Sequence, residues 1–162
     1  LKNIAMCSLL RTYGVFPTKG PWFKGMLSTV TDSPLRYVIP VNAEKGIIMT
    51  SYTDSTDTIH WTEFLKKGEN CLKDAIMDEL RRTFPEKNIP EPTVFKAHSW
   101  ELGCSYWMPG LYDPEAASER VMCPLPGTWS NLYVCGESYS MRQAWVEGAL
   151  EHSEKMLKKY FL

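Results

Sequence analysis

Apolar and β-branched runs separated by turn residues predict that the first half of the chain forms strands. Residues 4–10 are one such run, and residues 36–41 and 46–52 are two more, joined by only four residues. A connection of that length between β-rich runs is typical of an antiparallel hairpin. The proline-bearing and aromatic loop 14–25 is expected to lie at the surface.

Helical spacing appears in the second half of the chain. Residues 69–84 place apolar side chains on one face, and Pro85 is expected to end that helix. Residues 93–100 are a strand candidate, and residues 132–135 form a short apolar strand before a predicted helix over about 143–161. The pattern predicts an α+β fold: a mixed sheet, a mid-chain helix and a long C-terminal helix in one compact domain.

Composition narrows the possible roles. With 162 residues, 44% of them hydrophobic, the chain can bury one core, and its net charge of -1 supplies no basic stripe for nucleic acid. Its apolar runs are far shorter than the roughly 20 residues that span a bilayer, so no membrane partner is expected. Five cysteines without C-x-x-C spacing and three scattered histidines argue against a disulfide framework and against a metal site. We therefore expect an intracellular, cytoplasmic protein.

The turn after residues 132–135 has the chemistry of a ligand site. Gly136 lets the backbone approach a ligand closely, and a helix N-terminus presents unpaired N–H groups that attract negative charge. Glu137 is a good acceptor for sugar-type hydroxyl groups, which favours a polyol-bearing cofactor. The alternative is that Glu137 and Ser138 only cap the helix.

The run over residues 136–151 resembles the C-terminal signature of the flavin-containing amine oxidase family (monoamine oxidase-like). The matching features are the Gly136-Glu137 pair and an aromatic residue, Trp145, followed by x-Glu-Gly-Ala. The resemblance implies that Gly136 and Glu137 lie at the ribityl and phosphate end of FAD. It also implies that the backbone around Trp145 and Val146 meets the pyrimidine end of the flavin ring, where helix N–H groups stabilise negative charge.

Aromatic residues complete the implied site. Trp145 stands where the family has an aromatic wall, and residues 98–110 look like the family's tryptophan, glycine, aromatic and Pro-Gly stretch. This stretch would supply the opposite wall through Tyr106 or Trp107, so the implied substrate-binding residues are Tyr106, Trp107 and Trp145. Such walls position a flat or cationic substrate. Ordinary core packing is the alternative for these aromatic residues.

Two positions depart from the family pattern, and no catalytic residue is identified. Where many members have a lysine that works through water, the comparable stretch offers Arg11, which stays protonated and cannot act as a base. Some members attach FAD through a cysteine in the stretch that holds Cys104. The shorter spacing from Cys104 to Gly110 favours a buried structural cysteine instead.

The resemblance covers only the end of the family sequence. No G-x-G-x-x-G motif is present, and the chain begins at Leu1, so we expect a fragment that binds FAD weakly and is inactive alone. Residues 1–130 would be substrate-domain-like and residues 131–162 would face the flavin. The expected partners are a small-molecule amine and the missing dinucleotide-binding segment or a second copy.

The implied function is the substrate-side, C-terminal part of an FAD-dependent oxidoreductase that oxidises an amine. A non-enzymatic function is the alternative: a truncated interaction module with Trp22, Trp107 and Trp145 on an exposed former interface.

Overall fold

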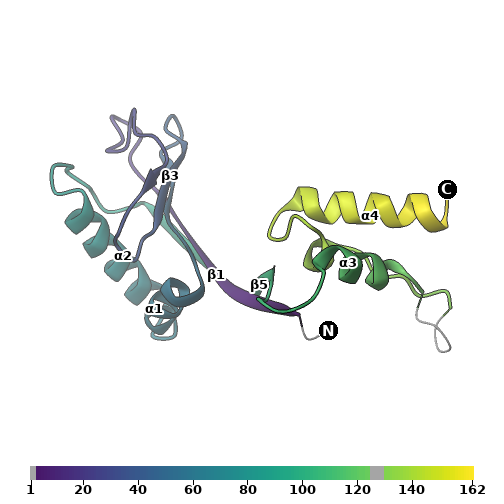
Figure 1. The fold of residues 1–162 in the computed structure, drawn as a ribbon. Helices are drawn as coiled ribbons and strands as arrows, with labels where there is room; N and C mark the ends of the chain where they lie inside the picture. The colour runs from purple at the N-terminus through teal and green to yellow at the C-terminus, as the bar shows by residue number, and fades with distance from the viewer. Residues whose placement is uncertain (1–2, 125–129) are drawn as a thin grey trace. The chain divides into compact units, whose positions relative to one another are not determined.

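The computed structural model describes residues 3–124 and 130–162. Packing divides the chain into two compact units, a sheet unit (Ser8–Glu101) and a terminal unit (Leu1–Cys7 with Leu102–Leu162). Two long strands, β1 (Ile4–Val15) and β5 (Val94–Trp107), each run from one unit into the other (Figure 1). The division expected at residue 130 concerns substrate and cofactor rather than packing, and it stays a prediction.

A five-stranded sheet in the order β2-β3-β4-β1-β5 confirms the expected α+β class. Besides β1 and β5, the sheet contains β2 (Thr29–Val30) at one edge, β3 (Tyr37–Asn42) and β4 (Ile47–Asp54). β3 and β4 form the predicted antiparallel hairpin, and β4 pairs with β1 in the same antiparallel sense. Asn42 Oδ1 accepts the backbone N–H of Lys45 at 2.9 Å, which closes the hairpin turn.

Two helices cover the sheet unit, and only one of them was expected. α2 (Glu69–Thr83) confirms the mid-chain helix, and it buries the apolar stripe that its spacing predicts. α1 (Ser55–Leu65) follows β4 directly, contacts both β4 and α2, and was not predicted. Only Thr58 and Trp61 of α1 are fully buried, so its sequence carries too weak an apolar period to be detected.

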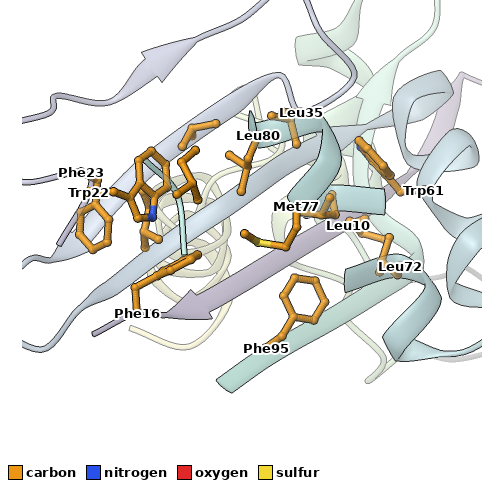
Figure 2. Close-up of a cluster of buried hydrophobic side chains, with 14 residues drawn as sticks. Leu10, Phe16, Trp22, Phe23, Leu35, Trp61, Leu72, Met77, Leu80 and Phe95 are labelled. Carbon is orange, nitrogen blue, oxygen red and sulfur yellow. The ribbon is translucent and has the colours of Figure 1, made fainter. Parts of the chain in front are cut away.

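The core of the sheet unit includes the loop that the sequence placed at the surface (Figure 2). Phe16, Trp22 and Phe23 are buried, and their rings meet edge to face at centroid distances of 5.5–6.3 Å. The surface prediction therefore holds for residues 17–20 and 24–25 but is wrong for these three aromatic residues, and Trp22 is not exposed as the interaction-module alternative requires. The apolar area that these three large aromatic side chains bury stabilises the packed loop, and this gain exceeds the tendency of its prolines and glycines to lie at the surface.

The terminal unit holds α3 (Pro114–Met122), a single 3₁₀ turn η1 (Glu137–Tyr139) and α4 (Val146–Tyr160). Both α3 and α4 contact η1. α4 confirms the C-terminal helix but begins three residues later than expected, because Ala144 has a φ of 66° and Trp145 is extended. None of the described helices combines the length and apolar character needed to cross a bilayer.

Residues 132–135 do not form the predicted strand. An isolated strand leaves its N–H and C=O groups without partners, and the sheet order includes no neighbour for this segment among the described strands. The segment still leads into η1 and α4, so the turn and helix of the expected strand-turn-helix are present.

Candidate functional site

Glu137 is the centre of the polar network in the terminal unit. Its Oε1 accepts the backbone N–H groups of Ser105, 3.1 Å away, and Ala144, 2.6 Å away. Its Oε2 lies 3.1 Å from the hydroxyl of Ser105 and 3.3 Å from that of Ser138. The carboxylate therefore ties β5, η1 and the segment before α4 together.

Gly136 enters the turn with a φ of 134°, a conformation that side-chain-bearing residues rarely adopt. Its backbone N–H donates to Nδ1 of His152 at 3.1 Å. His152 lies on α4 with 4% of its surface exposed, and its Nε2 has no hydrogen-bond partner in the described part of the chain. Burial lowers the pKa of His152, so the neutral ring that accepts the Gly136 N–H is favoured.

The first turn of α4 contains a glycine, Gly148, because there is no room for a side chain at this position. A Cβ at this position would lie 2.0 Å from the backbone oxygen of Arg142 and 2.5 Å from Oγ of Ser140. The segment before the helix therefore crosses directly over Gly148. Ser140 is itself buried, and its Oγ accepts the backbone N–H of Arg142 at 3.2 Å. The Gly-Glu pair and the later Glu-Gly-Ala are thus brought together by one tightly packed turn.

An open pocket of about 460 Å³ lies at the N-terminus of α4. Its lining residues are Met141, Arg142, Gln143, Trp145 and Glu147. Trp145 is the N-cap residue, supplies no side-chain cap to the helix, and exposes 68% of its surface. Val146, the next residue, is 71% exposed. The helix end that attracts negative charge is therefore accessible beside an aromatic ring and a cation, Arg142.

Tyr106 and Trp107 are adjacent on β5, but their side chains have different surroundings. Nε1 of Trp107 donates to the backbone oxygen of Ser140 at 3.3 Å, and its ring packs against Tyr112 and Tyr139 at centroid distances near 6 Å. Tyr106 is 48% exposed. Trp107 therefore serves packing in the terminal unit, whereas Tyr106 has the accessible ring.

Arg11 belongs to the sheet unit, where it is buried on β1. Its Nη1 donates to the backbone oxygens of Leu10 and Thr53 at 2.9 and 2.8 Å, and its guanidinium carbon lies 3.1 Å from the centre of the Tyr52 ring. These contacts give Arg11 a structural role. Within residues 3–124 and 130–162, no three His, Cys, Asp or Glu side chains gather as ligands for a metal ion.

The cofactor-binding role of Gly136, Glu137, Trp145 and Val146 stays a prediction, and sequence reasoning did not single out the residues that hold this segment in place. Ser105 and Ser140 lie far along the sequence from the groups that they bind. His152 lies on a face of α4 that the helical pattern did not single out. The buried residues of α4 are Gly148, His152 and Met156. Of the apolar residues that helical spacing places on one face, Met156 is buried, but Val146, Leu150 and Leu157 are exposed. No signal in the sequence marked Ser105, Ser140 or His152.

Comparisons with known proteins bear on the same residues. The family model described as flavin containing amine oxidoreductase matches residues 19–155. Aplysianin-A of Aplysia kurodai is 28% identical over 137 residues, which cover 71% of this chain and 24% of that protein. Uncharacterized protein R188 of Acanthamoeba polyphaga mimivirus is 24% identical over 153 residues, covering 82% and 28% respectively. The chain thus spans about a quarter of the length of these curated relatives.

Proposed function

This chain belongs to the family of flavin-containing amine oxidoreductases, and from that membership we propose that it forms the C-terminal, substrate-side part of an FAD-dependent enzyme that oxidises an amine. The observation that supports this role best is the open pocket at the start of α4, beside Trp145 and the exposed Val146. Because the match covers only about a quarter of the relatives, the other part of the FAD site would come from outside this chain. We also expect an intracellular location, from the cysteine spacing.

The residues at the start of α4 fit one end of a flavin. The helix begins without a side-chain cap, so its first N–H groups are available to a ligand that carries partial negative charge. Bound FAD would accept the two electrons and the hydrogen released by the carbon beside the amine. Within this chain, the backbone at Val146 would hold the pyrimidine end of the ring, and Trp145 would shield it from water.

Glu137 fits a role in holding the turn as well as a role in contacting FAD. A carboxylate offers about four lone-pair sites, and four protein groups of Ser105, Ser138 and Ala144 already lie at them. A ribityl hydroxyl would therefore have to replace one of the two serine hydroxyls. We propose that Glu137 first positions Ala144 and the start of α4, and contacts the cofactor through this exchange.

Trp145 and Tyr106 are the residues of this chain that we assign to the substrate. Both expose a large part of an aromatic ring, whose face attracts a cationic amine. Trp107 would support this arrangement from behind, through its hydrogen bond to Ser140 and its contacts with Tyr112 and Tyr139.

The first test is titration of the purified chain with FAD, followed by flavin absorbance and by quenching of flavin fluorescence. We expect weak, saturable binding, and Trp145→Ala should weaken it several-fold because the indole forms one side of the pocket. Trp100→Ala is the matched control, since Trp100 is an exposed tryptophan of β5 in the sheet unit and should leave binding unchanged. Anaerobic addition of amines to the flavin-loaded chain would then test for bleaching of the flavin bands.

Absence of any flavin binding, or equal losses in both variants, would contradict a flavin site on this chain. It would favour the second candidate, a non-catalytic interaction module. That alternative is supported by the apolar side chains that α4 exposes: Trp145, Val146, Leu150 and Leu157. On this reading the apolar face of α4 binds the dinucleotide-binding segment or a second copy of the chain.

Sedimentation analysis separates these partners. A second copy would give a dimer whose population rises with concentration and falls in Leu150→Glu. The control Lys158→Glu changes a nearby exposed residue of the same helix without touching the apolar side chains. A monomer at all concentrations would leave the dinucleotide-binding segment as the expected partner, to be added as a separate chain.

A further inference from the structure

Two cysteines that lie far apart in the sequence meet in the terminal unit. Sγ of Cys7, on β1, is 2.8 Å from Sγ of Cys104, on β5, and either thiol is positioned to donate a hydrogen bond to the other. Both residues are half-buried. From this contact we propose that Cys7 and Cys104 form a reversible disulfide, and that they react with small-molecule disulfides as a pair.

The register of the two strands supports this pairing. The backbone N–H of Met108 donates to the oxygen of Asn3 at 2.8 Å, and the hydroxyl of Ser105 lies 3.1 Å from the sulfur of Met6. Both contacts belong to the same antiparallel alignment, in which Cys7 lies directly opposite Cys104. Residues directly opposite on neighbouring antiparallel strands have Cα atoms about 4.5–5.5 Å apart, which is within the range that a disulfide bridges.

The other cysteines have different surroundings. Cys123 accepts a hydrogen bond from the hydroxyl of Tyr160 at 2.9 Å, Cys71 lies on α2 in the sheet unit, and Cys135 is exposed. The structure therefore separates one cysteine pair from three cysteines with other environments. The sequence expectation of no disulfide framework rested on spacing, which does not reveal a contact between residues 97 positions apart.

The reaction with a small-molecule disulfide balances as two successive exchanges. One cysteine thiolate attacks the small disulfide, forms a mixed disulfide and releases one small thiol. The second cysteine thiolate then attacks the protein sulfur of that mixed disulfide and releases the second small thiol. The protein loses two electrons and two protons, and the small disulfide gains both.

Such a bond would join the two segments of the terminal unit, which precede and follow the sheet unit in the sequence. Ser8, the first residue of the sheet unit, follows Cys7, and Glu101, its last residue, comes shortly before Cys104. The disulfide would therefore close a covalent loop that contains the whole sheet unit. A cross-link that closes a long loop constrains the unfolded chain strongly.

Oxidised glutathione is the probe that tests the proposal, with the reduced, folded 162-residue chain. Each cysteine of the chain outside the pair should gain one glutathione. Cys7 and Cys104 should together lose two hydrogen atoms and gain no glutathione. Trypsin places Cys7 in the peptide 3–11, Cys104 in 97–120 and Cys71 in 68–73. We expect one cross-linked product that joins peptides 3–11 and 97–120 and disappears after treatment with dithiothreitol.

Single variants provide the matched controls. Cys7→Ser should leave Cys104 to gain one glutathione, Cys104→Ser should do the same for Cys7, and Cys71→Ser should retain the cross-link in full. In the unaltered chain, separate glutathione adducts on Cys7 and Cys104, unreacted thiols at both, or cross-links spread over all cysteines would each overturn the proposal. The peptide map of the unaltered chain decides the question even if a variant fails to fold.

Discussion

The carboxylate of Glu137 accepts the backbone N–H of Ala144 at 2.6 Å, and Ala144 is held at a φ of 66°. A residue with a Cβ is strained in this left-handed conformation. The hydrogen bond therefore joins Glu137, the acidic residue of the family signature, to a strained residue two positions before α4. Its partner on the other side, the backbone N–H of Ser105, is buried.

Glu137→Ala should lower the free energy of unfolding by about 1–3 kcal/mol, because the buried Ser105 N–H loses its acceptor. Glu137→Gln retains an acceptor oxygen and should cost less. Urea unfolding followed by tryptophan fluorescence measures both, with the exposed Glu147→Ala as control. Equal stability of the unaltered chain and Glu137→Ala would show that the carboxylate has no structural role.

Ala144→Gly should raise the free energy of unfolding by up to about 1 kcal/mol. Glycine adopts positive φ without the steric cost, and this gain exceeds its extra entropy in the unfolded chain. Ala149→Gly is the control, because Ala149 lies inside α4 and glycine there should destabilise by about 1 kcal/mol. Destabilisation by both substitutions would mean that Ala144 is not strained in solution.

Gly148→Ala should destabilise the terminal unit by about 1–3 kcal/mol, although alanine is the better helix former. The added methyl would collide with the backbone of Arg142, which cannot move without displacing the turn. Leu150→Ala changes an exposed residue of the same helix and should cost less than about 0.5 kcal/mol. Thermal unfolding of both variants checks the difference, and a neutral Gly148→Ala would contradict the close approach.

His152 should make stability depend on pH. The pKa of His152 in the folded chain lies below the ordinary histidine value, chiefly because the ring is buried, while the nearby backbone of Ser118 opposes this shift. Between the folded and unfolded pKa values the unfolded chain binds more protons, so stability falls as pH falls below about 6.5 and is regained above it. Protonation at Nδ1 also removes the acceptor for the Gly136 N–H.

Denaturant unfolding from about pH 5 to pH 7.5 measures this effect. His152→Gln should flatten the pH dependence over that window, whereas His60→Gln, at an exposed position of α1, should leave it unchanged. Identical pH profiles for the unaltered chain and His152→Gln would contradict the assignment to this histidine.

Local patterns in the sequence determined the α+β class, the β3–β4 hairpin, α2 and α4. Each depends on residues close in sequence: Asn42 closes a turn onto Lys45, and the apolar stripe of α2 repeats at helical intervals. The signature around Gly136 and Glu137 indicated the family for the same reason, since its residues lie within one short stretch.

Tertiary structure decided what long-range contacts control. The burial of Phe16, Trp22 and Phe23, the failure of residues 132–135 to form a strand, and the meeting of Cys7 with Cys104 all depend on neighbours far along the chain. Periodicity reports which face of an element is apolar, but packing decides which face is covered. On α4 the close approach over Gly148 buries His152 and leaves Leu150 exposed, and no pattern within the helix specifies that choice.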